Sequence, residues 1–439
     1  RRSAPPTGSE ASEARFEVDV NYRILFGVEM EPHRKALSVN QMNQGPGTQV
    51  RENASPMIAK TRLFTPGPTP LSPVVLQAMG KNIPHHRTDE FRAIFKGARE
   101  GLQRFFKTSQ DVLILSCSGS GGMEAALVNT LSTGDTMLAL VAGNFGERWA
   151  NIGKAHGMDV QVLEAEWGTA VKPEAVKAAL DANPKIRGVF VQHNESSTGV
   201  KHDIQAIASV VKGRADVILV VDAISGMGAM PLHTEEWGVD VVVVGSQKAL
   251  ALPPGMAFVS VNDKAWQRIQ TTKSPKFYFD LLRERKTQVN FESAWTPPIS
   301  LVVALDAVLK DLEAAGGVDA LVKNAGTLAA MTRAAALSLG FPLLAPNDYG
   351  DALTALKAPA GIEIGKITKI LKGEFKSEVA GGQGKLKGQI MRVAHLGYYD
   401  VTDILGLIGT LEIALHKVGH KFTPGAGAAA ATAEYLKRA

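Results

Sequence analysis

From about residue 110 onward, hydrophobic and polar positions alternate between two patterns. Short, nearly continuous apolar runs predict buried strands, and stretches with apolar residues every three or four positions predict helices between them. The runs with strand character are Val112–Ser116, Met137–Val141, Val160–Leu163, Gly188–Gln192, Val217–Val221, Val241–Val244 and Ala257–Val261. Strands that alternate with helices in this way predict an α/β fold with a mainly parallel, mixed sheet flanked by helices.

The same patterns divide the chain into four parts. We expect a large domain over residues 57–315, a smaller C-terminal α+β domain over residues 316–422, and a flexible, Ala- and Gly-rich tail over residues 423–439. Residues 1–56 lack helical periodicity and are expected to be a disordered extension. Apolar residues alternate between Phe16 and Ile24, which leaves a strand-like arm open as the alternative.

Composition narrows the classes of function. The 48 basic and 43 acidic residues are mixed along the chain, which argues against a nucleic-acid-binding protein. The longest apolar runs are too short to cross a bilayer, so no membrane partner is expected. The single cysteine, Cys117, excludes an intrachain disulfide and a cysteine-rich metal site, and fits a reducing, cytoplasmic compartment. The pair His85-His86 lacks further ligands at a workable spacing, so no metal is expected.

Three chemical features follow apolar runs, at the ends where parallel strands place ligands. A Gly-rich stretch, Ser118–Gly122, separates a strand from a helix, and backbone N–H groups at such a point can hold a phosphate. Asp222 directly follows one apolar run, and Lys248 follows the next. Each feature alone has an ordinary structural explanation, as a turn, a helix cap or a surface lysine.

Together, these features match what pyridoxal 5′-phosphate (PLP) requires from a protein. Its phosphate needs a helix N-terminus, its pyridine nitrogen needs a carboxylate, and its aldehyde needs a lysine amine. Phe145 follows an intervening strand and can stack on the ring. We therefore predict PLP as the cofactor and Lys248 as the residue that forms the Schiff base.

Seven stretches of the chain form a set with a wider resemblance. They are Thr65–Thr69, Ser118–Leu127, Gly143–Arg148, His193–Gly199, Asp222 with its preceding strand, Gly245–Leu250 and Gly381–Gly397. This set resembles the class V aminotransferases of fold-type I, especially the alanine/serine–glyoxylate aminotransferase branch and its archaeal and cyanobacterial relatives. The resemblance extends from about Met57 to about Gly419, and it implies a large PLP-binding domain followed by a smaller one.

The resemblance implies a role for each matching residue. Lys248 would form the Schiff base and act as general acid and base, and Asp222 would pair with the pyridinium nitrogen. Arg392 would clamp the substrate α-carboxylate, and Gly67 would lie on the substrate side. Thr296 would reach the phosphate of the partner subunit, which implies a homodimer with shared active sites. The other implied cofactor ligands are Ser118, Gly119, Ser120 and Gln247 at the phosphate, Phe145 on the ring, and Ser196 and Thr198 near the ring hydroxyl.

The leading prediction is an aminotransferase that moves an amino group from serine or alanine to a 2-oxo acid such as glyoxylate or pyruvate. No second arginine is recognisable for a distal acidic group, which favours these small amino acids over aspartate, phosphoserine and 2-aminoethylphosphonate, the alternative substrates. A cysteine desulfurase shares the fold but would need a catalytic cysteine far along the chain, whereas Cys117 lies in the phosphate loop. A subunit without activity is a further alternative, and the presence of Lys248, Asp222 and Arg392 argues against it.

Overall fold

The computed structural model describes residues 60–438. The expected extension over residues 1–56 lies outside the described residues. The described residues belong to one compact unit.

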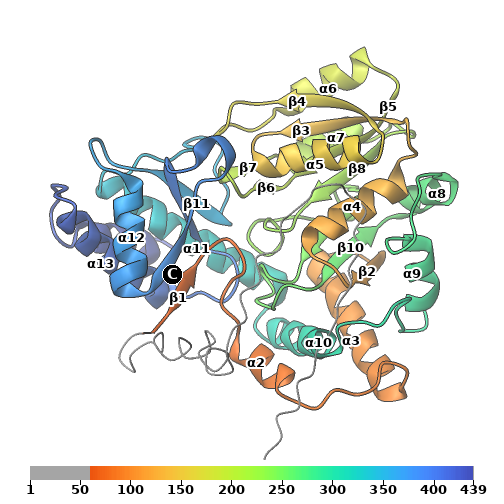
Figure 1. Cartoon of the computed structure of the whole chain (residues 1–439), viewed down its shortest axis with the longest axis horizontal. Coiled ribbons are helices and arrows are strands. Elements are labelled where there is room, and N and C mark those ends of the chain that lie inside the picture. The colour runs from red at the N-terminus through yellow and green to blue at the C-terminus, as the bar shows by residue number, and fades with distance from the viewer. Residues whose placement is uncertain (1–59, 439) are drawn as a thin grey trace, which may run out of the picture. The chain divides into compact units, whose positions relative to one another are not determined.

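A seven-stranded sheet forms the centre of this unit, in the order β2-β10-β9-β8-β5-β3-β4 (Figure 1). Its strands are β2 (Asp111–Leu115), β3 (Thr136–Val141), β4 (Asp159–Glu164), β5 (Ile186–Gln192), β8 (Ile218–Asp222), β9 (Val241–Gly245) and β10 (Ala257–Val261). All neighbours run parallel except β10, which is antiparallel to both β2 and β9. Each of the seven apolar runs forms one strand, so the predicted α/β fold with a mainly parallel, mixed sheet is confirmed.

Helices cover both faces of the central sheet, which explains why its strands are apolar along their whole length. Successive residues of a strand point to opposite faces, so Leu113 and Ile114 of β2 belong to different hydrophobic cores. The core around Leu113 includes α4 (Gly119–Thr130), α5 (Asn144–Ala155), α8 (Asp263–Thr271) and α9 (Leu281–Gln288). The core around Ile114 includes α2 (Pro73–Met79), α3 (Asp89–Phe106), α6 (Pro173–Ala182), α7 (Ile204–Val211) and α10 (Ile299–Ala314).

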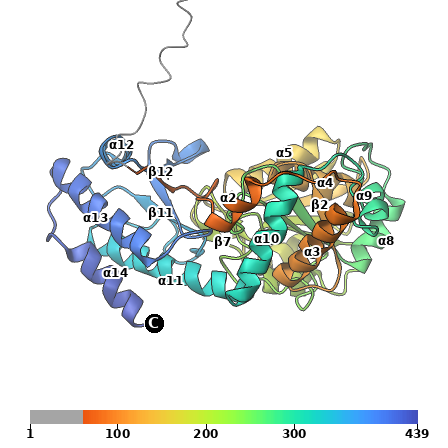
Figure 2. The same cartoon turned by 90° about the horizontal axis from the view of Figure 1, so that it is seen from below.

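A second sheet has four strands in the order β1-β12-β13-β11. Its strands are β1 (Arg62–Phe64), β11 (Leu353–Lys357), β12 (Ser377–Gly381) and β13 (Ile390–Ala394). The helices beside it are α11 (Gly317–Ser338), α12 (Ile364–Phe375), α13 (Val401–Lys417) and α14 (Ala426–Leu436), which share a separate core with the sheet (Figures 1 and 2). This region combines helices with strands, as the predicted fold class requires of its smaller part, and the expected bounds of a domain over residues 316–422 stay a prediction.

The first described strand belongs to this smaller sheet rather than to the large domain in which it was expected. Leu63 of β1 pairs in parallel with Glu378 of β12. Phe64 is buried in the core of the smaller region and stacks on Tyr399. The chain then passes through Thr65–Thr69 toward the central sheet, so this turn connects the two sheets.

The C-terminal residues also differ from the expectation of a flexible tail. Residues 426–436 form α14, which packs against α11 and buries Ala431 completely. The carboxylate of Glu412 accepts hydrogen bonds from the N–H groups of Gly425 at 2.7 Å and Gly427 at 2.8 Å. Small side chains therefore serve here to bring two helices close together, and Glu412 supplies the cap that the glycines lack.

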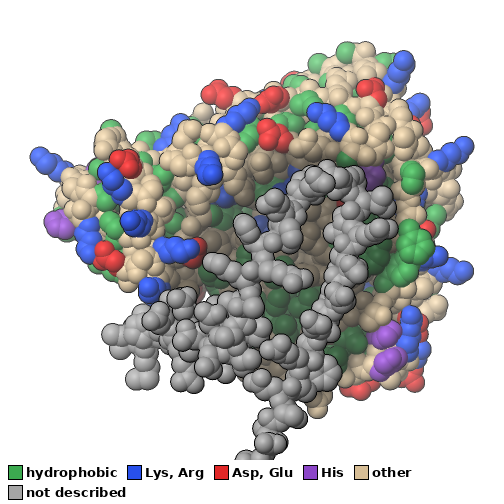
Figure 3. Space-filling model, viewed as in Figure 1, with side chains coloured by type: hydrophobic (Ala, Val, Ile, Leu, Met, Phe, Trp, Pro, Cys, Tyr) green, Lys and Arg blue, Asp and Glu red, His purple; other side chains and the backbone are tan. Residues whose placement is uncertain are grey.

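Within residues 60–438, none of the helices combines the length and the apolar character that a bilayer crossing requires. Figure 3 shows acidic and basic side chains interspersed around the edge of one face, without a large region of a single sign. This distribution agrees with the mixed charges along the sequence.

Candidate active site

Parallel strands end side by side at one edge of the central sheet. Gln192 at the end of β5 is in register with Asp222 at the end of β8, and Asp222 is in register with Val243 of β9. The chain beyond these strands helps to enclose a cavity of about 250 Å³. The predicted site residues that line this cavity are Gly67, Ser118, Gly119, Ser120, Phe145, Ser196, Asp222, Gln247 and Lys248. The fold thus brings together residues that are far apart in the sequence.

Lys248 lies in this cavity, in the turn beyond the end of β9. Its Nζ donates a hydrogen bond to the carbonyl oxygen of Pro66, and its own carbonyl oxygen accepts one from Thr69 Oγ1 at 3.0 Å. Burial lowers the pKa of the amine from 10.5 to about 8, and the charge of Asp222 acts in the opposite direction. A lysine with such a pKa has a neutral fraction near pH 7, as attack on a carbonyl carbon requires.

The turn at Gly67 leaves little room beside the Lys248 side chain. A methyl group on Gly67 would lie 2.7 Å from both Cε and Nζ of Lys248. Gly67 also has a φ of +132°, a conformation that residues with a side chain rarely adopt. Backbone conformation therefore favours glycine here, and any side chain at this position would have to displace the end of Lys248.

Asp222 is a buried carboxylate at the end of β8. Burial raises the pKa of its carboxyl from 3.8 to about 7, against the hydrogen bond that Oδ1 accepts from the N–H of Ile224 at 2.9 Å. A cation placed beside Asp222 would lower this pKa and keep the carboxylate ionised. The position therefore suits a ligand with a protonated ring nitrogen.

The N-terminus of α4 provides an anion site at the same cavity. Ser118 is the N-cap residue, but its side chain makes no capping hydrogen bond, so the first-turn N–H groups have no side-chain acceptor there. The helix dipole adds partial positive charge at this end. Arg148 contributes a full positive charge nearby, since its Nη1 donates to Ser120 Oγ at 2.7 Å. A phosphate fits both the backbone and the guanidinium donors.

Helix α5 brings Phe145 and Arg148 to the cavity from the end of β3. The guanidinium carbon of Arg148 lies 4.7 Å from the centre of the Phe145 ring. Arg148 was not among the predicted site residues. It is three positions after Phe145 on the same helix, and this spacing places both side chains on one face. That spacing is the signal from which Arg148 could have been predicted.

Two further polar residues that were not predicted line the cavity, Asn194 and Ser225. The hydroxyl of Ser225 is hydrogen-bonded to that of Ser196, and Asn194 Nδ2 lies 3.4 Å from each hydroxyl oxygen. These side chains form a polar wall that suits a ligand hydroxyl. Asn194 lies in the matched stretch His193–Gly199, whereas nothing in the sequence around Ser225 distinguishes it from a turn residue.

The remaining predicted residues, Arg392, Thr198 and Thr296, lie outside the lining of the cavity. Arg392 of β13 is adjacent to it, because its Nη1 donates to the carbonyl oxygen of Ser196 at 2.6 Å. Burial lowers the pKa of Arg392 to about 10, so the side chain remains charged at neutral pH. Thr198 donates to the carbonyl oxygen of Ala142 at 3.2 Å and so holds its own loop, and its place near the ring hydroxyl of the cofactor stays a prediction. Thr296 is exposed.

The thiol of Cys117 is poorly suited to nucleophilic chemistry. Burial raises its pKa from 9.0 to about 12, so the thiolate is scarce at neutral pH. Its Sγ also lies against the first turn of α4, where a methyl group on Gly121 would be only 2.9 Å away. The structure therefore supports a packing role for Cys117 in the phosphate loop.

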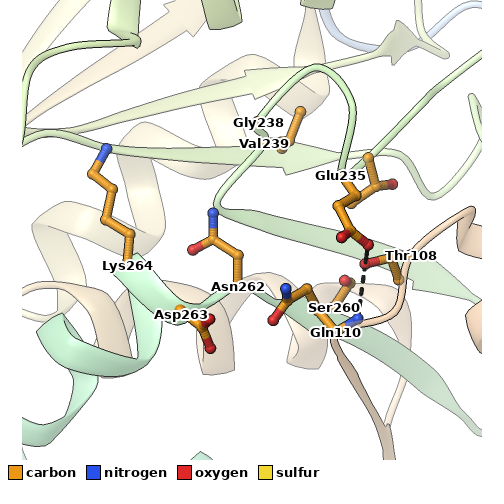
Figure 4. Close-up of a pocket in the computed structure, with 10 residues that line it drawn as sticks. Thr108, Gln110, Glu235, Gly238, Val239, Ser260, Asn262, Asp263 and Lys264 are labelled. Atoms are coloured by element: carbon orange, nitrogen blue, oxygen red, sulfur yellow. Dashed lines mark hydrogen bonds between the residues drawn. The ribbon is translucent and has the colours of Figure 1, made fainter.

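Another cavity, of about 190 Å³, lies beside the turn before β2 and the start of α8 (Figure 4). Its polar groups already serve the protein itself. Glu235 accepts hydrogen bonds from the hydroxyl of Thr108 and from the N–H of Ser109, and Asn262 caps α8. The predicted site residues do not line it. The cavity that holds Lys248 is therefore the candidate active site.

Comparison with known proteins identifies relatives along most of the chain. The family model described as Aminotransferase class-V matches residues 62–383. The soluble hydrogenase, small subunit, of Synechococcus sp. (strain PCC 6716) is 40% identical over 85% of this chain and 98% of its own length. The serine–glyoxylate aminotransferase of Methylorubrum extorquens is 33% identical over 86% of this chain and 96% of its own length. A crystal structure of a subgroup IV aspartate aminotransferase from Thermus thermophilus is similar with a TM-score of 0.76 at 32% identity, and covers 81% of this chain and 99% of that one.

Replacing Gly67 with alanine should displace the Lys248 side chain, because the new methyl group would overlap its Cε and Nζ. The positive φ adds strain, so we expect Gly67→Ala to lower the free energy of unfolding by about 1–2 kcal/mol. The affinity for PLP, measured by the absorbance of the cofactor bound to Lys248, should fall about tenfold or more. Gly406→Ala is the matched control, since a methyl group there meets no heavy atom within 4 Å. Unchanged cofactor binding in Gly67→Ala would contradict the steric argument.

Proposed function

The chain belongs to the class V aminotransferases, and we propose that it uses PLP to transfer the amino group of serine or alanine to glyoxylate or pyruvate. The observation that carries this proposal is the position of Lys248 in one cavity with Asp222 and the N-terminus of α4. An amine, a carboxylate and an anion site are the groups that bind the aldehyde, the ring nitrogen and the phosphate of this cofactor.

The donor set of the cavity fits PLP. Lys248 would bind its aldehyde, Asp222 its ring nitrogen, and Ser120 with the first turn of α4 its phosphate. Oε1 of Gln247 is buried and has no hydrogen-bond partner among the described residues, so the amide of Gln247 is available to a ligand. When bound, the cofactor supplies an aromatic ring that takes up the electron pair of a bond broken at the substrate α-carbon.

The protein side chains would then hold the substrate and move its proton. Nζ of Lys248, with its pKa near 8, can take a proton from the substrate α-carbon and return one at neutral pH. Arg392 would orient the substrate carboxylate through N–H donors of its two terminal nitrogens, while Nη1 keeps one hydrogen for the carbonyl oxygen of Ser196. The partial burial of Lys248 and the burial of Arg392 limit contact with water and strengthen these interactions.

The arginines near the site favour substrates with small side chains. Among the described residues, Arg148 is the arginine that lines the cavity. It is already hydrogen-bonded to Ser120 at the N-terminus of α4. If Arg392 binds the α-carboxylate, no arginine of the lining is left for a distal carboxylate or phosphonate. If aspartate were the amino donor, Arg148 would have to leave Ser120 to bind the second carboxylate. This rearrangement distinguishes the alternative function, an aminotransferase for acidic donors, from the proposed one.

We expect purified protein with PLP to transfer amino groups from serine or alanine to glyoxylate or pyruvate. The rate with aspartate should be at least about tenfold lower, because its second carboxylate would lack a free charged partner. Lys248→Ala should abolish transfer and the absorbance of the bound cofactor, while the exposed Lys154→Ala serves as the matched control. Turnover in the Lys248→Ala variant, or no transfer from any of these donors, would contradict the proposed function.

Asp222→Asn should retain PLP but lose most of the transfer rate. The ring nitrogen would no longer face a negative charge in a buried site, and this loss is worth about 2–4 kcal/mol, or roughly two to three decades in kcat. The control is Asp203→Asn, since Asp203 is the N-cap of α7 and asparagine caps a helix equally well. A near-normal kcat would mean that Asp222 serves only as a turn residue.

We also propose that the protein is a homodimer with shared active sites. Phe277 is 70% exposed and Tyr278 is 42% exposed, and both pack on Trp295, next to Thr296. An exposed aromatic cluster of this kind is typical of a protein interface. Covering it with a second subunit would bring the exposed Thr296 toward the cavity of that subunit, as the family resemblance implies.

Mixing two inactive variants tests whether the sites are shared. Lys248→Ala lacks the reactive amine, and Thr296→Arg should block the position at which Thr296 contributes to the other subunit. A mixed dimer combines an intact Lys248 with an intact Thr296 in one of its two sites, so mixing should partly restore activity. Sedimentation should show a dimer at the assay concentration. An active monomer, or no recovery in verified mixed dimers, would contradict shared sites.

A further inference from the structure

Helix α5 begins at Asn144 with Gly143 at its N-cap position. Glycine has no side chain that could accept hydrogen bonds from the free N–H groups of the first helical turn. These N–H groups are nevertheless satisfied by side chains about 50 positions further along the chain. The cap of α5 is therefore supplied from another part of the fold.

Glu195 and Ser197 provide this cap. The carboxylate of Glu195 accepts hydrogen bonds from the N–H groups of Phe145 at 3.1 Å and Gly146 at 2.9 Å. Ser197 Oγ accepts the N–H of Asn144 at 2.9 Å and donates its own hydrogen to Glu195 Oε1 at 2.6 Å. Glu195 is completely buried, so its side chain has no competing contact with solvent.

Space, rather than backbone conformation, requires the glycine at position 143. Its φ of 162° is extended, and any residue can adopt it. A methyl group there would lie 2.3 Å from Ser197 Oγ and 2.6 Å from both Cγ and Cδ of Glu195. Position 143 therefore has no capping side chain because Glu195 occupies the volume that such a side chain would need.

The helix compensates the charge that Glu195 buries. Burial raises the pKa of its carboxyl, and the hydrogen bonds from Ser197, Gly146 and Phe145 lower it. The positive end of the α5 dipole also favours an anion at this point. Replacing the carboxylate with a neutral group would therefore remove both hydrogen bonds and a favourable charge interaction.

Helix α5 carries Phe145 and Arg148 into the cavity, and the N–H of Phe145 is itself one of the capped groups. We propose that Glu195 is a positioning residue, which holds the Phe145 ring and the Arg148 guanidinium against the cofactor by capping α5. Its neighbour Ser196 holds Arg392 through a carbonyl oxygen, so one loop positions groups on the cofactor side and on the substrate side. The contact with a cofactor rests on the proposed function, whereas the capping does not.

Glu195→Gln tests the capping role, because it removes the charge and turns an amide NH₂ toward backbone N–H groups. In the cofactor-free protein, we expect amide hydrogen exchange at Phe145 and Gly146 to accelerate about tenfold. The dissociation constant for PLP should rise about tenfold as well, because Phe145 and Arg148 are no longer held in place. KM for the amino donor should change less than this, since the contact of Arg392 with Ser196 is retained.

The matched control is Glu147→Gln, which removes a charge from the same first turn of α5. Among the hydrogen bonds of residues 60–438, none involves the carboxylate of Glu147, so exchange and PLP affinity should stay near the wild-type values. A second variant, Gly143→Ser with Glu195→Ala and Ser197→Ala, replaces the distant cap with a local one and removes both side chains that a Cβ at position 143 would meet. It should recover at least part of the exchange protection and of the PLP affinity that Glu195→Ala with Ser197→Ala loses.

Unchanged exchange at Phe145 and Gly146 in Glu195→Gln would overturn the capping role. A lower melting temperature with an unchanged dissociation constant for PLP would show that Glu195 acts on stability alone, and would overturn the positioning role. If Glu195→Gln does not fold, the triple variant decides, because failure to recover protection or PLP affinity would equally contradict the proposal. Wild-type protein that does not bind PLP would contradict the proposed function, and the exchange measurement would still test the cap.

Discussion

Burial of Lys248 and Asp222 at the ends of neighbouring strands is the constraint on which the site depends. Each side chain loses solvation there, so the pKa of the amine falls to about 8 and that of the carboxyl rises to about 7. Removing two charges from water costs stability, and the hydrophobic cores on both faces of the central sheet offset this cost. The strands β8 and β9, fully buried and held in register, keep the two groups in place.

The central sheet and the residues directly after its strands could be predicted from the sequence. Apolar runs of this length, bounded by turns, leave few alternatives to buried strands, and Asp222 and Lys248 follow such runs. Arg148 was signalled only by its spacing of three positions from Phe145 on α5, and Ser225 lies in a turn, where a polar residue is common and carries no signal of its own. β1 is only three residues long, and its partner β12 is distant in sequence, so no local pattern could assign it to the smaller sheet. The sequence of α14 suggested a flexible tail because its stability comes from packing against α11 and from the cap at Glu412.

The loop that contains the short strands β6 (Asn194–Glu195) and β7 (Val200–Lys201) joins the two sheets. The carbonyl oxygen of Ser196 accepts a hydrogen bond from Arg392, and the carbonyl oxygen of Gly199 accepts one from the N–H of Gly350 at 2.8 Å. Both Arg392 and Gly350 belong to the smaller region. A substrate carboxylate that binds Arg392 would therefore contact the same guanidinium that links the two regions through the carbonyl oxygen of Ser196.

The pairing of β1 with β12 has a consequence for the order in which the protein folds during synthesis. Leu63 leaves the ribosome early, whereas its partner Glu378 is made after most of the chain. The central sheet can form first, since its strands follow one another over residues 111–261. The smaller sheet must wait, and its closure is a contact between distant positions, of the kind that slows folding. Until then the turn that carries Gly67 has no fixed position over Lys248. We therefore expect the cavity that Gly67 and Lys248 line to be completed late in folding.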